Sequence, residues 1–281
     1  MDVKPQNAAA PPARAEQGRQ RDESWLGFGR FLLLVLIAVL AFRTVVFSPF
    51  SIPSESMLPR LVNGDYLLAA KWPYGWSRHS LPFDAPLMEG RVLASMPERG
   101  DIVIFKHPLD RSDYVKRVIG LPGDTVAMVG GQVVLNGAPV PRKAMPDFEI
   151  AISPNTTCAW GGRRVISAAG GGGAVCRYTR FRETLPGGRE YDVLDFGATV
   201  ADTLAPVTVP EGHMFVMGDN RDNSRDSRFP ARIGDAVGIV PLENLVGEAS
   251  VIMWSTDGRA EWLRPWTWLA ATRWDRIGTR L

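Results

Sequence analysis

From residue 48 onward, short apolar runs alternate with turn-forming residues. Apolar and polar side chains that alternate over about four to eight residues are typical of half-buried β-strands. The runs predicted to be strands are 65–71, 101–106, 113–120, 125–129, 132–135, 213–217 and 246–254. The dipeptides Gly130-Gly131 and Asn136-Gly137 are typical of β-hairpin turns. We therefore predict a mainly β body, built of antiparallel sheets, over residues 48–281.

One segment near the N-terminus breaks this pattern. Residues 25–47 contain an uninterrupted apolar core at 31–42, and as a helix they would extend roughly 35 Å, enough to cross a bilayer. A cleavable secretory signal peptide and a buried core helix are the alternatives. A signal peptide ends in small residues, but Ala41 is followed by a phenylalanine and an arginine. A core helix has a polar face, which residues 31–42 lack, so we predict an uncleaved transmembrane anchor over 25–47.

The residues before this anchor are rich in alanine, proline, glutamine and charge. Such a composition predicts a disordered tail over residues 1–24. Arginines accumulate on this side, whereas beyond Arg43 the next basic residue is Arg60. Because basic residues favour the cytoplasmic side of a membrane, the tail is predicted to be cytoplasmic and the body to lie outside.

Composition narrows the possible functions. The chain has 281 residues, of which 45% are hydrophobic, so it can bury a substantial core. Thirty-two basic residues against thirty acidic ones give a net charge of +2, which argues against a nucleic-acid partner. Two cysteines rule out a four-cysteine zinc site, and no metal or other cofactor is expected.

Two parts of the body lack clear strand signals. Residues 147–199 are predicted to form an irregular insertion or small subdomain, which contains Cys158 and Cys176. These cysteines either pair in an oxidising compartment outside the cytoplasm or remain separate free thiols. Residues 262–281 are dense in tryptophan and arginine, and are predicted to form a helix that lies on a membrane surface or packs on the sheet.

Histidine is the usual base for a serine nucleophile, but no sequence motif marks any of the three histidines as a catalytic base. His79, His107 and His213 lie in loops or at strand ends, and the chain has no G-x-S-x-G motif. The S-x-x-K pattern of penicillin-recognising enzymes is also absent. We expect ordinary surface or turn roles for all three, with no support for a Ser-His-Asp triad.

A serine-containing segment follows the anchor at residues 50–59. Its two prolines disfavour a helix, so Ser54 and Ser56 are held in a rigid, turn-like strand. Serine-rich linkers follow many anchors and are the alternative. A linker would not be bordered by apolar residues such as Ile52 and Met57.

A lysine lies in the predicted strand 113–120. Tyr114, Lys116 and Val118 share one face of this strand, and an inward-packed face would remove the Lys116 amine from water. Desolvation lowers the pKa of an amine, which could then accept a proton from a serine near neutral pH. In the alternative the opposite face is buried through Val115, and Lys116 reaches toward solvent.

Residues 218–228 combine aspartate, asparagine, serine and arginine in one loop. Such a loop can form a platform of salt bridges and hydrogen bonds. A calcium loop is the competing interpretation, because Asp222, Ser224 and Asp226 alternate. The loop lacks the glycine and the final glutamate that a calcium loop of this kind needs.

Together these segments closely resemble bacterial signal peptidase I, the membrane-anchored Ser/Lys endoprotease that removes leader sequences. Four ordered blocks carry the resemblance: IPSESMLP (52–59), RGDIVIF (99–105), DYVKRVIGLPGD (113–124) and GDNRDNSRDSR (218–228). With the anchor, it spans about residues 25–250. The resemblance implies a catalytic domain on the outer side of the inner membrane and signal-peptide-bearing precursors as substrates.

The resemblance also implies the reaction chemistry. Ser56 is the expected nucleophile and Lys116 its general base, in the Ser-Lys variant of the serine protease mechanism. The Ser56 backbone N–H and the Ser54 hydroxyl are expected to form the oxyanion hole.

Further residues are expected to support this pair. Ser224 would hydrogen-bond the lysine amine, and Asp226 and Arg228 would form a supporting ion pair. Asp219 and Arg117 are expected in the same network.

The implied substrate is an extended segment, bound as an added strand, with small residues at the first and third positions before the cut. Phe50, Ile52 and Val115 would line its shallow pockets. Glu55 and Arg60 depart from the family pattern, where glycine and threonine are usual. A charge at these positions could alter substrate preference.

Two other functions remain possible. A soluble self-cleaving repressor shares the Ser/Lys pair but carries a DNA-binding module and lacks an anchor. An anchored extracytoplasmic binding module needs no catalysis, and it predicts that Ser56 and Lys116 lie far apart.

Overall fold

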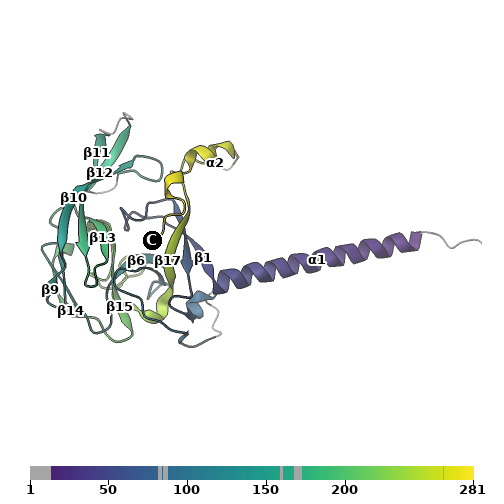
Figure 1. The fold of residues 1–281 in the computed structure, drawn as a ribbon, viewed down its shortest axis with the longest axis horizontal. Coiled ribbons are helices and arrows are strands. Elements are labelled where there is room, and N and C mark those ends of the chain that lie inside the picture. Colours follow the sequence, from purple (N-terminus) through teal and green to yellow (C-terminus); the bar gives the residue numbers. More distant parts are fainter. Residues whose placement is uncertain (1–13, 82–83, 85–87, 159–160, 168–172, 262) are drawn as a thin grey trace, which may run out of the picture. The chain divides into compact units, whose positions relative to one another are not determined.

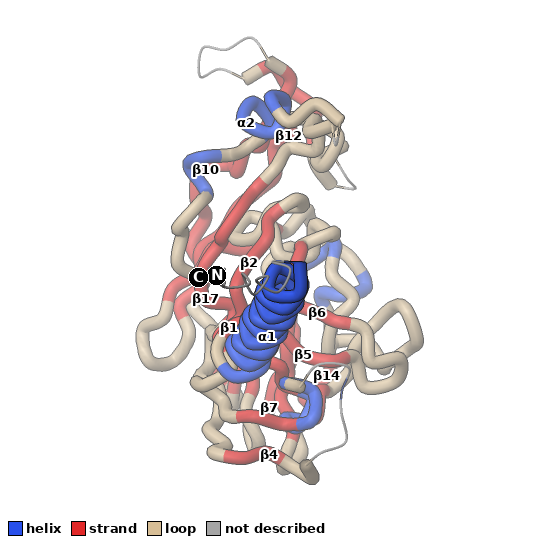
Figure 2. Tube along the Cα trace, turned by 90° about the vertical axis from the view of Figure 1, so that its right-hand side faces the viewer, coloured by secondary structure: helices blue, strands red, loops and turns tan. Residues whose placement is uncertain are grey.

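The computed structural model describes residues 14–81, 84, 88–158, 161–167, 173–261 and 263–281. The chain divides into two compact units, Met1–Arg43 and Thr44–Leu281. The larger unit consists mainly of strands, and its named strands all pair antiparallel (Figures 1 and 2). This confirms the mainly β fold class.

Four sheets make up the larger unit. The largest has seven strands in the order β1-β2-β17-β5-β6-β15-β16. Its strands are β1 (Phe47–Ser51), β2 (Asp65–Ala70), β5 (Ile102–Lys106), β6 (Asp113–Gly120), β15 (His213–Met217), β16 (Val240–Pro241) and β17 (Leu245–Ser255). A second sheet contains β10 (Arg142–Ala151), β11 (Arg163–Ile166), β12 (Ala174–Thr184) and β13 (Glu190–Leu194). A third sheet contains β7 (Thr125–Val129), β8 (Gln132–Leu135), β9 (Ala138–Pro139) and β14 (Leu204–Thr208). The fourth pairs β3 (Trp76–Ser77) with β4 (Arg91–Val92).

Every predicted strand is present, as β2, β5, β6, β7, β8, β15 and β17, with ends shifted by at most one residue. The two predicted hairpin turns also form. Gly130 and Gly131 join β7 to β8, and Asn136 and Gly137 join β8 to β9. All four residues have positive φ, which is the backbone geometry of a tight type I′ turn.

The stretch predicted to be irregular, 147–199, contains most of the second sheet. Strand β12 pairs with β10, β11 and β13, so the expected irregularity is corrected to a regular antiparallel sheet. Periodicity could not reveal β10, because most of its side chains are exposed and Pro146 lies at a register shift between Met145 and Phe148. The glycine-rich residues 168–172 lie outside the described residues.

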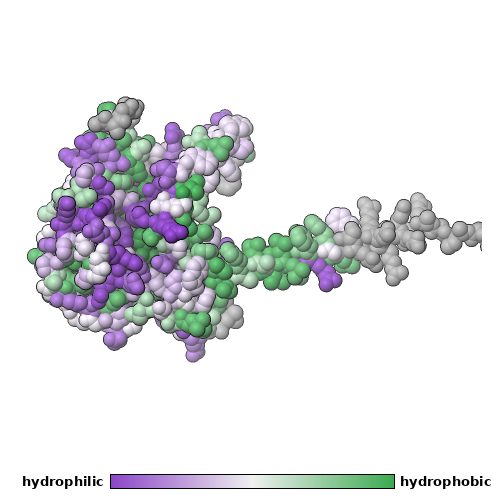
Figure 3. Space-filling model, in the orientation of Figure 1, coloured by the Kyte–Doolittle hydropathy of each residue, from purple (hydrophilic) through white to green (hydrophobic). Residues whose placement is uncertain are grey.

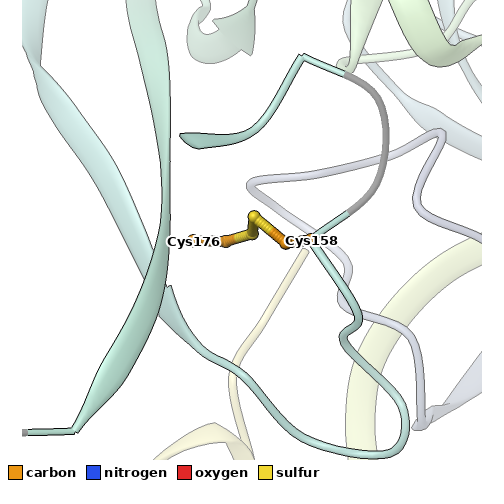
Figure 4. Close-up of a disulfide and its surroundings, with 2 residues drawn as sticks. All are labelled: Cys158 and Cys176. Carbon is orange, nitrogen blue, oxygen red and sulfur yellow. A yellow bond between two sulfur atoms is a disulfide. The ribbon is translucent and has the colours of Figure 1, made fainter. Parts of the chain in front are cut away.

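The two cysteines of this region form a disulfide, which settles the alternative left open by the sequence. Cys176 lies on β12 and Cys158 precedes β11, with their Cα atoms 5.3 Å apart (Figure 4). Cys176, together with Tyr178 and Leu194, is buried in an apolar cluster that also includes Leu58. The disulfide therefore stabilises the second sheet next to the segment that follows Ser56.

The smaller unit contains most of helix α1 (Arg14–Val45), whose large apolar side chains between Trp25 and Val45 are exposed (Figure 3). This stretch is long and apolar enough to cross a membrane. Because α1 begins at Arg14, the predicted disordered tail is corrected for residues 14–24, which are rich in the helix formers alanine, glutamate, glutamine and arginine. Residues 1–13 lie outside the described residues.

The C-terminal segment differs from the single helix predicted for 262–281. Helix α2 covers only Trp266–Ala271, and a short turn of 3₁₀ helix follows at Trp274–Arg276. The remaining chain returns along β17 through the bridge between Val251 and Arg280, and Leu281 packs on the core. Bridges to a neighbouring strand compete with helical hydrogen bonds, which explains the short helix.

The disulfide gives a first testable prediction. It closes a loop between residues 18 positions apart, so replacing both cysteines by serine should destabilise the body by about 3 kcal/mol through the entropy of the unfolded chain. The measurement is urea unfolding in detergent, with and without reductant. Reductant should lower the stability of the parent protein and leave the double variant unchanged. A parent protein indifferent to reduction would contradict the prediction.

Candidate active site

The structure brings together a serine and a lysine that are 60 residues apart in the sequence. The Nζ atom of Lys116 lies 2.7 Å from the Oγ atom of Ser56. Both residues are buried, with 3% and 8% of their surfaces exposed. This proximity is the opposite of what a non-catalytic binding module predicts.

Burial changes the chemistry of the Lys116 amine. Removal from water lowers its pKa to about 8, even though the carboxylates of Asp226 and Asp219 favour the charged form. Its alternate neighbour on β6, Val118, is fully buried in an apolar cluster, and Tyr114 packs against that cluster. The alternative in which Lys116 reaches solvent is therefore wrong.

The segment that carries Ser56 is anchored on both sides. The backbone N–H of Ile52 donates to the Asp65 carbonyl at 2.8 Å, and Met57, Leu58 and Leu61 are completely buried. A flexible linker would leave these apolar residues in water, so the linker alternative is wrong.

The second serine lies beside the first. The Oγ atoms of Ser54 and Ser56 are 3.4 Å apart, and Ser54 is exposed where it lines a cavity next to the dyad. A hydroxyl in this position can donate a hydrogen bond to a group that reacts with Ser56.

The loop at 218–228 packs directly behind the dyad, where Gly218 leaves no room for a side chain. A Cβ atom on Gly218 would lie 2.3 Å from the Oγ atom of Ser224 and 2.5 Å from the carbonyl oxygen of Ser56. Only glycine allows the loop to approach the nucleophile this closely.

Two ion pairs hold this loop, and both join the partners expected from the sequence. Asp226 accepts hydrogen bonds from the Nε and Nη2 atoms of Arg228 at 2.8 and 2.9 Å. Asp219 accepts from the Nε and Nη2 atoms of Arg117 at 2.7 and 2.6 Å. Burial alone would raise the pKa of Asp226, but the Arg228 guanidinium lowers it overall. Asp226 therefore stays ionised near the lysine amine.

A third buried ion pair was not found from the sequence. Glu183 on β12 accepts from both terminal nitrogens of Arg221 at 2.7 and 2.6 Å, and the Tyr191 hydroxyl also donates to it. Glu183 and Arg221 are 1% and 2% exposed. The sequence shows Glu183 only as one charge in an arginine-rich run, with no signal for its partner. This pair joins the second sheet to the loop behind the dyad.

The Ser224 hydroxyl is buried behind the dyad, close to Asp226, whose pKa it helps to lower. Its expected bond to the Lys116 amine stays a prediction. The competing calcium interpretation is wrong. Asp222 accepts hydrogen bonds from the Phe196 N–H and the Thr199 hydroxyl, while Asp226 is paired with arginine. Within the described part of the chain, no group of three acidic, histidine or cysteine residues could hold a metal.

The histidines take no part in the dyad. His107 is buried and bonds the Ala236 carbonyl, His79 pairs with Asp84, and His213 bonds the Glu211 carbonyl. The expected surface or turn roles are therefore wrong for His79 and His107, which are buried, because both rings make polar contacts inside the body.

A cavity of about 420 Å³ opens beside the dyad. It is lined by both dyad residues and Ser54, and by the three predicted pocket residues Phe50, Ile52 and Val115. Tyr114 and the charged residues Asp113 and Arg225 also line it.

The two departures from the family pattern have different surroundings. Arg60 lines a different cavity, of about 650 Å³, together with Arg117 and Asp192. Glu55 is half-buried between the two serines, and burial raises the pKa of its carboxyl. An effect of either charge on substrate preference stays a prediction.

Comparison with known proteins shows which family this chain belongs to. Residues 25–254 match the family described as signal peptidase, peptidase S26. Signal peptidase I of Rickettsia typhi is 36% identical over 82% of this chain and 80% of its own length. Signal peptidase I of Rickettsia akari is 32% identical over 86% of this chain and 88% of its own length. A signal peptidase I structure from Enterococcus faecalis aligns with 55% of this chain and 97% of its own, at 24% identity and a TM-score of 0.29.

The chain belongs to the signal peptidase family, peptidase S26. It is a membrane-bound serine endopeptidase that removes signal peptides from precursor proteins, and a Ser/Lys dyad is a general property of this family. The non-catalytic binding module and the self-cleaving repressor are thereby excluded.

The buried ion pairs give a second prediction. Asp219→Ala should lower the free energy of unfolding by about 3–5 kcal/mol, because it leaves the buried Arg117 guanidinium without its partner. The matched control is Glu261→Ala, which breaks the exposed pair with Arg264 and should change stability by less than about 1 kcal/mol. Urea unfolding followed by tryptophan fluorescence measures both. Equal losses of unfolding free energy in the two variants would show that burial does not increase the contribution of the Asp219 pair to stability.

Proposed function

We propose that Ser56 is the nucleophile and Lys116 the general base of this peptidase. The observation that carries the proposal is the 2.7 Å separation between a serine hydroxyl and a buried amine whose pKa is about 8. A neutral amine at this distance accepts the hydroxyl proton while Ser56 Oγ attacks the carbonyl carbon of the scissile bond. The proton passes directly from Ser56 Oγ to Lys116 Nζ, without an intervening group.

The remaining steps return each proton to its source. The Lys116 ammonium donates its proton to the leaving nitrogen as the C–N bond breaks, which leaves the substrate acyl group esterified to Ser56. Lys116 then takes a proton from water, and the hydroxide attacks the ester carbonyl. The ester C–O bond breaks and the proton returns to Ser56 Oγ.

The negative oxygen formed in both attacks needs hydrogen-bond donors. We assign this role to the backbone N–H of Ser56 and to the hydroxyl of Ser54, which lies beside the nucleophile. Loss of one donor in such a site typically costs about a hundredfold or more in rate.

Ser224, Asp226 and Arg228 support the dyad in this proposal. The Asp226 carboxylate, kept ionised by Arg228, raises the pKa of Lys116 and so limits how far burial lowers it. The Ser224 hydroxyl is buried behind the dyad, and we assign it to hydrogen-bond the amine during the reaction.

The substrate is proposed to bind as an added strand with small side chains at the first and third positions before the cut. Strand β1 supports this, because it is an edge strand of the seven-stranded sheet and, among the described strands, pairs with β2 alone. Phe50, Ile52 and Val115 then form the walls of shallow pockets that accept alanine and exclude larger side chains.

The proposed location is the inner membrane, with the N-terminus in the cytoplasm and the catalytic unit on the outer side. The arginines before the apolar segment support this orientation. Ser56 lies eleven positions after Val45, the end of the candidate span, and this short connection would keep the nucleophile close to the bilayer where a signal peptide presents its cleavage site.

The dyad gives a third prediction. Ser56→Ala and Lys116→Ala should each reduce the rate of precursor cleavage at least about a thousandfold. The nucleophile and its base act as one unit, so the loss of either removes most of the rate enhancement. The measurement is conversion of a purified precursor to its mature form, with circular dichroism as a check on folding. Ser95→Ala and Lys143→Ala, which change exposed residues elsewhere, should cleave at the parent rate. Normal cleavage by Lys116→Ala would refute the proposed base.

The pKa of Lys116 gives a fourth prediction. The charged amine is inactive, so kcat/KM should fall about tenfold for each pH unit below the pKa and level off above it. The midpoint is expected near pH 8. The substrate should be a peptide without ionisable side chains, and Lys143→Ala should keep the parent profile. A rate that stays constant from pH 6 to pH 9 would contradict a lysine base.

A further inference from the structure

One completely buried side chain next to the nucleophile has no role in the mechanism described so far. Asn220 has 0% of its surface exposed and lies in the loop behind the dyad. Its backbone N–H donates to the Ser56 carbonyl at 3.1 Å. Its side-chain Nδ2 donates to the Glu55 carbonyl at 3.0 Å. Asn220 therefore holds the two peptide groups on either side of the Ser56 Cα atom.

The bond to Glu55 acts on the oxyanion hole through the geometry of one peptide group. The Glu55 carbonyl and the Ser56 N–H belong to the same planar, trans peptide unit, so they point in opposite directions. A donor that fixes the carbonyl also fixes the direction of the N–H on the other side. The carbonyl also receives the Leu58 N–H at 3.1 Å, and hydrogen bonds to a carbonyl polarise the N–H of the same peptide.

We propose that Asn220 is a positioning residue, whose carboxamide aims the Ser56 N–H at the oxyanion. This inference rests on the proposed function, because it assumes that the Ser56 N–H stabilises the tetrahedral intermediate. Its hydrogen bonds go to the backbone carbonyls of Glu55 and Ser56, so it acts through the peptide units and not on the reacting side chains.

The carboxamide is not required to dock the loop. The Asn220 backbone N–H already bonds Ser56, and the Leu194 N–H donates to the Asp219 carbonyl at 2.9 Å. The buried pair of Arg221 and Glu183 adds a third attachment. Removal of the Asn220 side chain therefore leaves the loop attached and takes away mainly the bond to Glu55.

The experiment is Asn220→Ala in the full-length protein. We expect kcat to fall about tenfold to a hundredfold with KM changed less than about twofold, because the lost stabilisation belongs to the transition state. A peptide aldehyde that ends in alanine forms a tetrahedral adduct with Ser56, and its Ki should rise by the same factor as kcat falls. Active-site titration gives the concentration of folded sites, and Asn220→Ser provides a second variant that lacks the amide donor.

The matched control is Asn244→Ala. Asn244 is also buried, and its Nδ2 donates to the Lys106 carbonyl at 2.8 Å, away from the dyad. It should lower the melting temperature to a similar extent as Asn220→Ala while kcat and the aldehyde Ki stay at parent values. Loss of kcat in both variants would show a merely structural effect and overturn the inference.

Three further outcomes for Asn220→Ala would overturn the positioning role: an unchanged kcat, a change in KM alone, or a fall in kcat without a matching rise in the aldehyde Ki. Ser56→Ala, measured in parallel, separates this inference from the proposed function. An inactive Ser56→Ala together with a fully active Asn220→Ala overturns only the role of Asn220. An active Ser56→Ala overturns the nucleophile itself.

Discussion

The withdrawal of one amine from water is the constraint on which the site depends. Lys116 lies 2.7 Å from Ser56 and is almost completely buried, so its charged form loses the hydration that an exposed lysine has. Two nearby carboxylates, Asp219 and Asp226, act in the opposite direction and keep the pKa at about 8 rather than far lower. At this pKa a useful fraction of the Lys116 amine is neutral near physiological pH. The neutral amine is still a strong enough base to accept the Ser56 proton.

Carboxylates can be held beside a buried amine only if cations compensate them. Asp226 pairs with Arg228, and Asp219 with Arg117, which follows Lys116 on the same strand. Buried charges of this kind cost free energy unless their geometry is good, and both pairs are bidentate. The seven-stranded sheet supplies the lysine and one arginine, while the loop after β15 supplies the rest.

The sequence contains enough information for the strands that are short apolar runs between turn residues and for the two members of the dyad. β5 and β15 are such runs, and the blocks around Ser56 and Lys116 are distinctive in residue type and order. The strands of the second sheet escaped detection because β10 is mostly exposed and three half-buried arginines interrupt the apolar residues of β12.

Contacts between distant segments could not be predicted in the same way. Glu183 on β12 bonds Arg221 in the loop after β15, and Asn220 bonds the backbone of Glu55, so neither contact leaves a local pattern. The burial of Ser224 depends on the close approach of the loop at Gly218, which also leaves no local pattern. Sequence therefore identifies the reacting groups better than the residues that orient them.

The ion pair between Glu183 and Arg221 has a consequence for the size of the smallest working enzyme. Arg221 is buried within the loop that supports Ser56, and its only carboxylate ligand among the described residues comes from β12. Deletion of the second sheet would trap an uncompensated guanidinium in the interior. A shortened version of this peptidase must therefore retain β12, which carries Glu183, together with the strands that pair with it.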